Sequence, residues 1–297
     1  MQEFKTFPSK ILLFGEHIIN KGSNGLATPF SVFNCKLSFD ITTETLNASE
    51  EVLVLIFNQI NNDENLSEIF DLVSFEQDIY NGLKININIP VGYGLGSSGA
   101  ICAGVYDEYC YSKTENPHEI KRILGEMEGA FHGKSSGLDP LVSFLNKSVL
   151  VTKKTTEIVD FKIENNIEFH IFLVDTKQAR KTAPLVNVFL EKYDSNESFA
   201  RLVSQELVPL TNEIIDDFLS NSLEQTYSKI AKLSALQLKI FKEFILEKYL
   251  KLWKKALNNN DFYLKICGAG AGGFMLGFCK DKSCVLDVFD EDLIIFL

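Results

Sequence analysis

The sequence predicts an α+β fold made of two domains. The chain has 297 residues, about twice the length of a typical single domain. Strand-like segments and helical stretches follow one another without the regular strand–helix alternation of a parallel α/β sheet. No repeat or low-complexity linker separates them. We place the domain boundary near residue 160, which gives domains over residues 1–160 and 161–297.

The first domain is expected to contain three strands and several helices. One strand is a short apolar run, and the other two alternate polar and apolar side chains, as strands with one buried face do. The last helix has Pro117 near its first turn, a position that proline favours. The strands are predicted at 11–14, 36–42 and 83–89, and the helices at 52–80, 96–111 and 117–131.

The second domain is expected to begin and end with strands around a long helical stretch. The helical pattern covers residues 183–257 and is interrupted near Asp194 and Asn221. It stops at the run Asn-Asn-Asn-Asp over residues 258–261, whose side chains favour turns. The strands are predicted at 148–152, 168–174, 263–267, 274–278 and 293–296.

The composition excludes several classes of protein. With 29 Lys+Arg against 40 Asp+Glu, the net charge is −11, which argues against binding nucleic acid or anionic membranes through a basic face. No apolar run approaches the roughly 20 residues that span a bilayer, and the N-terminus has no signal-peptide pattern. The six cysteines form no CxxC pair and the four histidines no zinc motif. We therefore expect a cytoplasmic protein with reduced cysteines.

The segment PVGYGLGSSGA, residues 90–100, follows one predicted strand and opens the next predicted helix. Its glycines let the backbone approach a ligand closely, and the free N–H groups at a helix N-terminus suit a phosphate. Ser97 and Ser98 are placed to cap this helix or to reach a metal. The segment is neither a Walker A loop nor a GxGxxG motif. A tight strand–helix turn with a serine N-cap explains it equally well.

A second glycine-rich loop, residues 268–273 (GAGAGG), lies between two predicted strands near the C-terminus. A single loop of this kind is explained by a hairpin. Two such loops in one chain, each beside a strand, favour a nucleotide site.

The segment EGAFHGKSSGLD, residues 128–139, carries candidate metal and catalytic residues. Glu128 and His132 share one face of a helix because they are four residues apart. Asp139 follows a glycine turn that can bring it back toward that face. Carboxylates beside a polyphosphate suit Mg²⁺ and can orient a hydroxyl nucleophile. Taken alone, the segment is better explained by a solvated Glu–His pair and a turn aspartate.

Lys10 begins the apolar run of the segment PSKILLFGEH. Its ammonium group can either extend to solvent or neutralise the charge of a phosphate. Glu16 and His17 follow directly after the predicted strand.

Together and in this order, these segments resemble the GHMP kinases, the superfamily of galactokinases, homoserine kinases, mevalonate kinases and phosphomevalonate kinases. The resemblance rests on three motifs spread between residues 8 and 278. Within the superfamily the chain is most similar to the mevalonate kinases, on PSKILLFGEH, on HGKSSGLD and on the segment DTKQARKT at residues 175–182. The other subfamilies each differ from this set in at least one motif.

The resemblance implies a ribosomal protein S5 domain 2-like N-terminal domain and a ferredoxin-like C-terminal domain, with the active site in the cleft between them. It implies transfer of a phosphoryl group from ATP, with Mg²⁺, to the 5-hydroxyl of mevalonate in the mevalonate pathway of isoprenoid biosynthesis. No nucleic-acid or membrane partner is expected, and a homodimer stays open.

The resemblance also implies roles for single residues. Asp139 would act on the substrate hydroxyl as base or orienting group, with Lys10 close to it and to the γ-phosphate. Ser98 and Glu128 would hold Mg²⁺, and Glu16, His17 and Thr182 would face mevalonate. From their charge, Lys177, Arg180 and Lys181 are candidates for attracting its carboxylate. The residues implied in ATP binding are Gly94, Leu95, Gly96, Ser97, Ser98, Gly268, Gly270 and Gly272.

Five positions depart from the family pattern, each by exchange of one small residue for another: Ser9, Gly99, Ser135, Cys267 and Ala271. None removes an implied catalytic side chain, so the changes bear on the substrate more than on kinase chemistry.

Two alternatives stay open. One is another GHMP kinase, acting on phosphomevalonate or a sugar, and the other is a non-catalytic ATP-binding sensor of the same fold. The presence of Lys10, Glu128 and Asp139 favours an enzyme.

Overall fold

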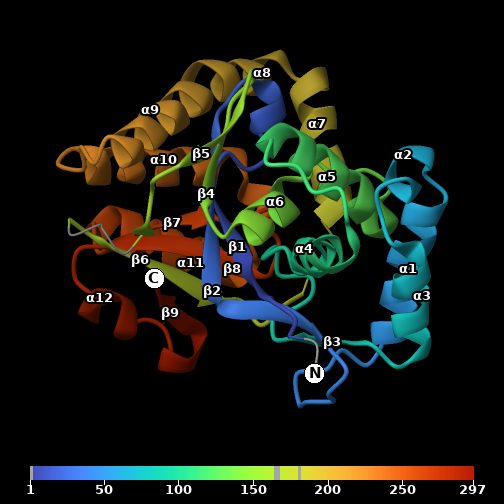
Figure 1. The fold of residues 1–297 in the computed structure, drawn as a ribbon. Coiled ribbons are helices and arrows are strands. Elements are labelled where there is room, and N and C mark those ends of the chain that lie inside the picture. Colours follow the sequence, from blue (N-terminus) through green and yellow to red (C-terminus); the bar gives the residue numbers. More distant parts are fainter. Residues whose placement is uncertain (1–2, 164–167, 180–181) are drawn as a thin grey trace. The chain divides into compact units, whose positions relative to one another are not determined.

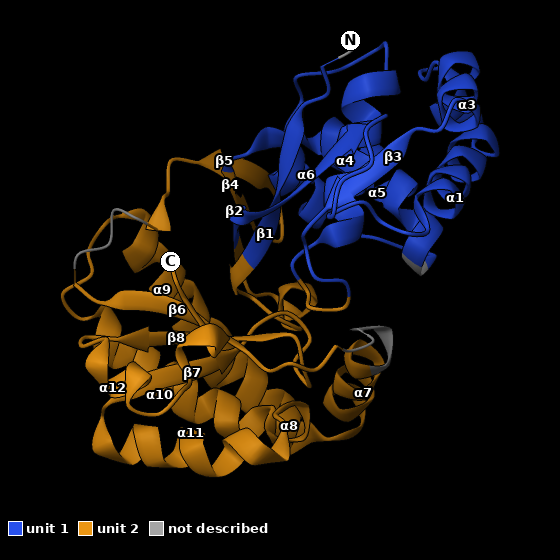
Figure 2. Cartoon of the chain, turned by 90° about the horizontal axis from the view of Figure 1, so that it is seen from below, with its two compact units in different colours: residues 1–11, 27–91, 95–147 blue, residues 12–26, 92–94, 148–297 orange. Residues whose placement is uncertain are grey.

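The computed structural model describes residues 3–163, 168–179 and 182–297 and combines helices with two sheets (Figure 1). The chain forms two compact units (Figure 2). Unit 1 contains residues 1–11, 27–91 and 95–147, and unit 2 contains residues 12–26, 92–94 and 148–297. The short segment Gly92–Gly94 of unit 2 lies inside the first glycine segment. The domain boundary near residue 160 stays a prediction.

Unit 1 combines strands with a cluster of helices. The long strand β2 (Gly25–Ser38) is a neighbour of β1 (Thr6–Phe14) in the sheet. The short strand β3 (Lys84–Ile87) also pairs with β2, antiparallel, with Ile85 opposite Leu37. Helix α4 packs against α5 and α6, and α1 packs against α5. The helices are α1 (Ser49–Asn61), α2 (Glu64–Ser67), α3 (Leu72–Tyr80), α4 (Ser97–Tyr109), α5 (Pro117–His132) and α6 (Leu138–Leu145).

Unit 2 is built around a four-stranded antiparallel sheet in the order β7 (Phe262–Ile266), β8 (Phe274–Cys279), β6 (His170–Asp175) and β9 (Ile294–Phe296). Helices α10 and α11 pack on β7. The remaining elements are η1 (Ile19–Lys21), β4 (Ser148–Val151), β5 (Thr156–Val159), α7 (Thr182–Ser195), α8 (Glu197–Leu202), the π-helix η3 (Val203–Leu207), α9 (Val208–Leu219), α10 (Thr226–Ile240), η4 (Lys242–Phe244), α11 (Glu247–Asn259), α12 (Ser283–Leu286) and η5 (Glu291–Leu293).

Helix α11 shows how the helices of unit 2 meet the sheet. Tyr249, Trp253 and Ala256 are buried, and their spacing of four and three residues places them on one face. The Trp253 indole donates a hydrogen bond of 2.8 Å to Ser234 of α10. The helix ends at Asn259, and the cap residue Asn260 that follows has the left-handed conformation that asparagine tolerates. No helix in the described part of the chain is both long and apolar enough to cross a membrane.

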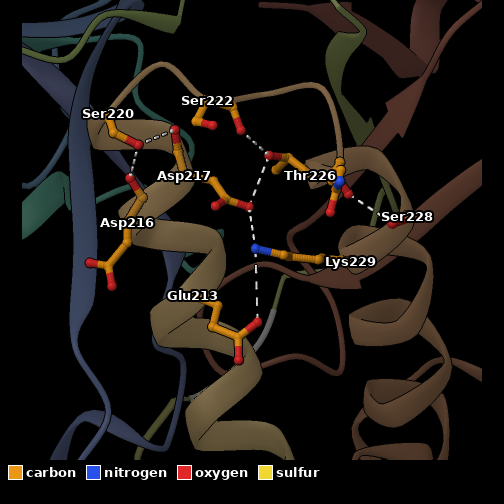
Figure 3. A network of polar contacts seen from close by, with 9 residues as sticks. Glu213, Asp216, Asp217, Ser220, Ser222, Thr226, Ser228 and Lys229 are labelled. Carbon is orange, nitrogen blue, oxygen red and sulfur yellow. Dashed lines mark hydrogen bonds and ion pairs between the residues drawn. The ribbon is translucent and has the colours of Figure 1, made fainter.

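A polar network closes the turn between α9 and α10 (Figure 3). The Lys229 ammonium lies 2.8 Å from the Asp217 carboxylate and 3.8 Å from that of Glu213. The Thr226 hydroxyl donates to Asp217 over 3.0 Å. These contacts hold the start of α10 against the end of α9.

Most of the predicted elements are confirmed, with a correction to one strand. The strand predicted over 36–42 is wrong beyond Ser38, where β2 ends. There the Ser38 hydroxyl accepts from the N–H of Asp40, and the Thr45 hydroxyl accepts from the N–H of Thr42. Side chains that bond nearby backbone groups compete with a strand ladder, so the chain turns although its polar–apolar alternation continues.

The long helical stretches are confirmed but more divided than predicted. Residues 52–80 contain three helices, and the interruptions expected near Asp194 and Asn221 correspond to the ends of α7 and α9. A further interruption between α10 and α11 was not predicted, and α6, β5 and α12 have no counterpart among the predicted elements.

Gly277 in the centre of β8 lies directly opposite Phe172 of β6. A methyl group at Gly277 would come within 2.2 Å of the Phe172 ring, so this ring occupies the place of a side chain. We expect Gly277→Ala to lower the free energy of unfolding by about 1–3 kcal/mol, the usual cost of overpacking. Chemical denaturation would measure it.

The matched control is Gly129→Ala in helix α5, where the added methyl group meets only the Gln59 side chain, at 3.6 Å. This change should be neutral or stabilising, because alanine favours a helix over glycine. Equal unfolding free energies for Gly277→Ala and the wild type would contradict the packing argument.

Candidate functional site

The first glycine segment is held in a left-handed conformation at every second residue. Gly92, Gly94 and Gly96 have φ angles of 79°, 77° and 75°, which cost little only for glycine. Gly96 is the N-cap of α4, and the first turn of this helix carries no acidic side chain. As predicted, the segment thus opens a helix. The N–H groups and dipole of the helix N-terminus favour an anion there.

Strand β1 and helix α6 bring Lys10 and Asp139 to this helix start within unit 1. The Lys10 ammonium lies 2.9 Å from the Asp139 carboxylate. A methyl group at Gly96 would lie 3.1 Å from Cγ of Lys10 and 3.3 Å from Cβ of Asp139, so both side chains pack directly on the glycine segment. The N–H of Lys10 also donates to the Leu95 carbonyl over 2.9 Å. The ion pair therefore stands beside the candidate phosphate loop.

Glu128 on α5 is buried between two hydroxyl groups. Ser98 donates to one carboxylate oxygen over 2.7 Å, and Ser135 donates to the other. Burial, and then the nearby charge of Asp139, raise the pKa of Glu128 to about 7, although the two serine hydrogen bonds and Lys10 favour the ionised form. A desolvated carboxylate with hydroxyl neighbours is a place where a cation is favourable.

Gly99 sets the distance between α4 and the start of α6. A methyl group at this position would lie 2.7 Å from the backbone nitrogen of Pro140 and 2.9 Å from the carbonyl carbon of Asp139. The backbone that carries Asp139 therefore approaches α4 as closely as a glycine permits. The sequence marked Gly99 as a departure from the family pattern, but its contact with α6 could be seen only in the structure.

In unit 2, Glu16 forms a buried ion pair with Lys265 of β7. Only 1% of either side chain is exposed, and the Lys265 ammonium also donates to the Ile266 carbonyl over 2.7 Å. A buried charge is tolerated only when it is paired and hydrogen-bonded. The pair thus ties the turn after β1 to the strand that leads into the second glycine loop. Sequence reasoning missed Lys265, whose signal is a single charge in the otherwise apolar strand FYLKI.

His17 contacts the same glycine loop from a cage of aromatic rings. Its Nε2 atom lies 3.0 Å from the Ala269 carbonyl oxygen; because a carbonyl only accepts, Nε2 carries a proton. The rings of Phe189, Phe241 and Phe244 surround the imidazole at centroid distances of 5.1–5.4 Å. Consecutive residues Glu16 and His17 therefore both brace the entry to the second glycine loop.

The second glycine loop joins β7 to β8, as predicted. Its glycines have positive φ angles at 268, 270, 272 and 273, and Ala271 has φ 56°. A methyl group at Gly270 would lie 2.6 Å from the Phe244 carbonyl oxygen, and the N–H of Ala271 donates to this oxygen over 2.5 Å. The loop therefore lies against η4 with no room for larger residues at Gly270.

The structure gathers the implied site residues into two groups. Unit 1 brings together Lys10, Gly96, Ser98, Glu128 and Asp139, and adds Ser135, which the sequence had not singled out as a site residue. Unit 2 brings together Glu16, His17 and the loop containing Gly268, Gly270 and Gly272. The side chains of His132 and Thr182, and the candidates Arg180 and Lys181, lie outside the described residues. Lys177 forms an ion pair of 3.2 Å with Asp175.

Comparisons with known proteins identify similar sequences and folds. Residues 56–147 match the family model of the GHMP kinases N terminal domain. The chain is 26% identical to a mevalonate kinase of Methanocaldococcus jannaschii over 97% of this chain and 96% of the relative. Mevalonate kinases of Thermococcus onnurineus and Pyrococcus horikoshii are 25% and 22% identical to it.

Solved structures show the same fold. The L. major mevalonate kinase in complex with R-mevalonate matches with a TM-score of 0.70 and 14% identity, over 100% of this chain and 95% of that one. A Lactococcus lactis galactokinase complexed with galactose matches with a TM-score of 0.66 and 15% identity, over 100% and 93%. Residues 56–147 therefore match the GHMP kinases N terminal domain, and the chain shares the fold of these solved structures, which confirms the predicted fold class and the resemblance to mevalonate kinases.

Glu128 gives the folded protein a measurable pH dependence in the absence of metal. Between its usual pKa of 4.5 and about 7, the folded chain keeps a proton that the unfolded chain has lost, so stability falls as the pH rises through this window. Glutamine imitates the protonated acid at all pH values. We expect Glu128→Gln to gain stability relative to the wild type as the pH rises, by about 3 kcal/mol at pH 8.

Urea unfolding in EDTA between pH 4.5 and 8.5 measures this difference. The control Glu119→Gln removes an exposed carboxylate from the same helix, so its difference from the wild type should not change across this window. A Glu128→Gln curve parallel to that of the wild type would show that the buried carboxylate does not hold its proton.

Proposed function

We propose that this chain is an ATP-dependent kinase that phosphorylates the 5-hydroxyl of mevalonate. The observation that carries the proposal is the Lys10–Asp139 ion pair of 2.9 Å, packed on Gly96 at the N-terminus of α4. A carboxylate and an ammonium group beside a phosphate-binding helix start are the side chains that phosphoryl transfer to an alcohol requires.

The residues present fit ATP and Mg²⁺. The ATP phosphates would lie against residues 94–98, with Gly268, Gly270 and Gly272 supporting the nucleotide. Mg²⁺ usually takes one or two protein oxygens and completes its shell with phosphate oxygens and water, a demand that Glu128 and Ser98 meet. A bound Mg²⁺ would neutralise phosphate charge. The binding of a cation would also favour the ionised form of Glu128.

Asp139 and Lys10 would share the chemical step. The mevalonate hydroxyl oxygen forms the new bond to the γ-phosphorus while the bond to the β–γ bridging oxygen breaks and ADP leaves. Asp139 orients the hydroxyl and accepts its proton. Lys10 pairs with Asp139 and would neutralise charge on the γ-phosphate, so that most of the catalysis comes from positioning and electrostatics.

Mevalonate is favoured as the acceptor by similarity to mevalonate kinases along nearly the whole chain. His17 and Thr182 are proposed on the acceptor side, with Lys177 as one candidate for attracting the carboxylate. Glu16 is buried against Lys265 and would act there only through its neighbours. Because a galactokinase shares the fold, the fold alone does not choose among acceptors. Free thiols at all six cysteines support a cytoplasmic location, and the homodimer stays a prediction.

The direct test is ADP release from MgATP with one acceptor at a time: mevalonate, phosphomevalonate, galactose or homoserine. We expect turnover with mevalonate, and its reduction by about 10²–10⁴-fold in Asp139→Asn, the range that a general base contributes. Affinity for MgATP should stay within about threefold. Lys10→Met should also lose most of its turnover. The control Asp287→Asn changes an exposed aspartate and should behave as the wild type.

Each other outcome would point to a different function or mechanism. Turnover with another acceptor would keep the mechanism and replace the substrate. Binding of MgATP without turnover of any acceptor would favour the non-catalytic sensor. Near-normal turnover in Lys10→Met or Asp139→Asn would contradict the assignment of the catalytic pair.

The close approach at Gly99 makes a second prediction about catalysis. Gly99→Ala must push α6 away from α4, and a misplacement of about 1 Å in a reacting group can cost about 100-fold in rate. We expect kcat to fall about 10–100-fold. The matched control is Gly104→Ala on the same helix, where the new methyl group would meet the Leu37 side chain at an ordinary 3.4 Å. A normal kcat in Gly99→Ala would mean that Asp139 does not depend on this contact.

A further inference from the structure

Tyr93 occupies an unusual place in the first glycine segment. It stands between Gly92 and Gly94, which both have left-handed φ angles. Glycine backbones rotate freely and lose much conformational entropy when they are ordered. Tyr93 supplies the only side chain beyond hydrogen in the segment Gly92–Gly94 of unit 2. Residues 92–94 form the entry to the phosphate loop, and any side chain that anchors this entry must therefore be that of Tyr93.

The backbone and ring of Tyr93 both contact the second glycine loop. A methyl group at Gly273 would lie 2.6 Å from the Tyr93 carbonyl oxygen. The two backbone segments therefore approach each other as closely as only glycine allows. The Tyr93 ring packs edge-on against Phe274 at a centroid distance of 5.4 Å and an angle of 62°. The two glycine-rich stretches of the sequence, 180 residues apart, thus meet at one tyrosine.

The hydroxyl of Tyr93 makes a third contact, with Asp175 at the end of β6. Burial, then the negative charge of Asp175 and hydrogen bonding to its carboxylate, raise the pKa of Tyr93. Asp175 is itself fixed by Lys177, whose N–H donates to it over 2.7 Å and whose ammonium lies 3.2 Å away.

The chain that follows Asp175 is bound to the same glycine loop. The Thr176 hydroxyl donates to the Gly273 carbonyl over 2.6 Å, and the N–H of Gly273 donates to the Gln178 carbonyl over 2.7 Å. Residues 175–178 and the second glycine loop therefore form one connected framework, which the backbone and the ring of Tyr93 contact.

We propose that Tyr93 is a positioning residue that locks the entry of the phosphate loop onto this framework and so orders the nucleotide site before ATP binds. The inference rests on the proposed kinase function and adds a residue that the sequence did not identify. Tyr93 acts through the backbone of its glycine neighbours. Removing its hydroxyl leaves the ring contact in place but frees the loop, so that part of the ordering must then be done by the bound nucleotide.

The test is direct binding of MgATP, without an acceptor, measured by calorimetry. Tyr93→Phe should weaken binding by about 3–10-fold, the range expected for the loss of one typical intramolecular hydrogen bond. Asp175→Ala should weaken binding as well. In the Asp175→Ala background, Tyr93→Phe should have almost no further effect, because the double-mutant cycle isolates the Tyr93–Asp175 interaction. Tyr80→Phe, at a residue 91% exposed on α3, is the matched control.

Kinetics separate positioning from general damage. Tyr93→Phe should raise the KM for ATP, leave kcat and the KM for the acceptor within about twofold, and melt within about 1 °C of Tyr80→Phe. Wild-type affinity for MgATP in Tyr93→Phe would overturn the inference, as would additive effects in the cycle or a fall in melting temperature that accounts for the lost affinity. A wild-type protein that does not bind MgATP would instead refute the proposed function.

Discussion

The Glu128 and Asp139 carboxylates and the Lys10 ammonium group lie close together in unit 1. Their need for ion-pair and hydrogen-bond partners constrains the rest of that unit. Charged groups are costly to bury unless they are paired or hydrogen-bonded. Asp139 is paired with Lys10, and Glu128 is held by the hydroxyls of Ser98 and Ser135. These five residues come from β1, α4, α5, the turn before α6 and α6 itself, so five separate parts of the chain must meet with side-chain precision. The close approaches at Gly96 and Gly99 make this possible.

Unit 2 also contains buried polar groups, and these are paired by a different set of residues. Glu16 and Lys265 are almost completely buried and satisfy one another, while His17 reaches the Ala269 carbonyl from a cage of aromatic rings. Both contacts brace the loop between β7 and β8. Tyr93 and Thr176 hold the far end of this loop at Gly273. A loop with positive φ angles at five of its six residues would otherwise be flexible, so these contacts decide whether it can support a ligand.

Local signals were sufficient for much of the fold. Helix α5 begins where Asn116 caps it and Pro117 fits the first position, and both preferences are properties of the residues themselves. The alternation over 83–89 similarly predicted β3. The same signal failed after Ser38, because hydroxyl groups of nearby residues bond the backbone and end the strand. Periodicity reports which faces are apolar, and it does not report such competing hydrogen bonds.

By itself, the sequence determined the α+β class, the two glycine-rich stretches and the identity of the charged residues beside them, because each depends on neighbouring residues along the chain. Only the tertiary structure decided which charges meet. Glu16 pairs with Lys265, which is 249 residues away in the sequence, and Glu128 accepts a hydrogen bond from Ser98, which is 30 residues away. The perturbed pKa of Glu128 and the anchoring of Tyr93 likewise depend on burial and on distances between remote segments. No local pattern encodes these distances, since they are set by how the helices and strands pack.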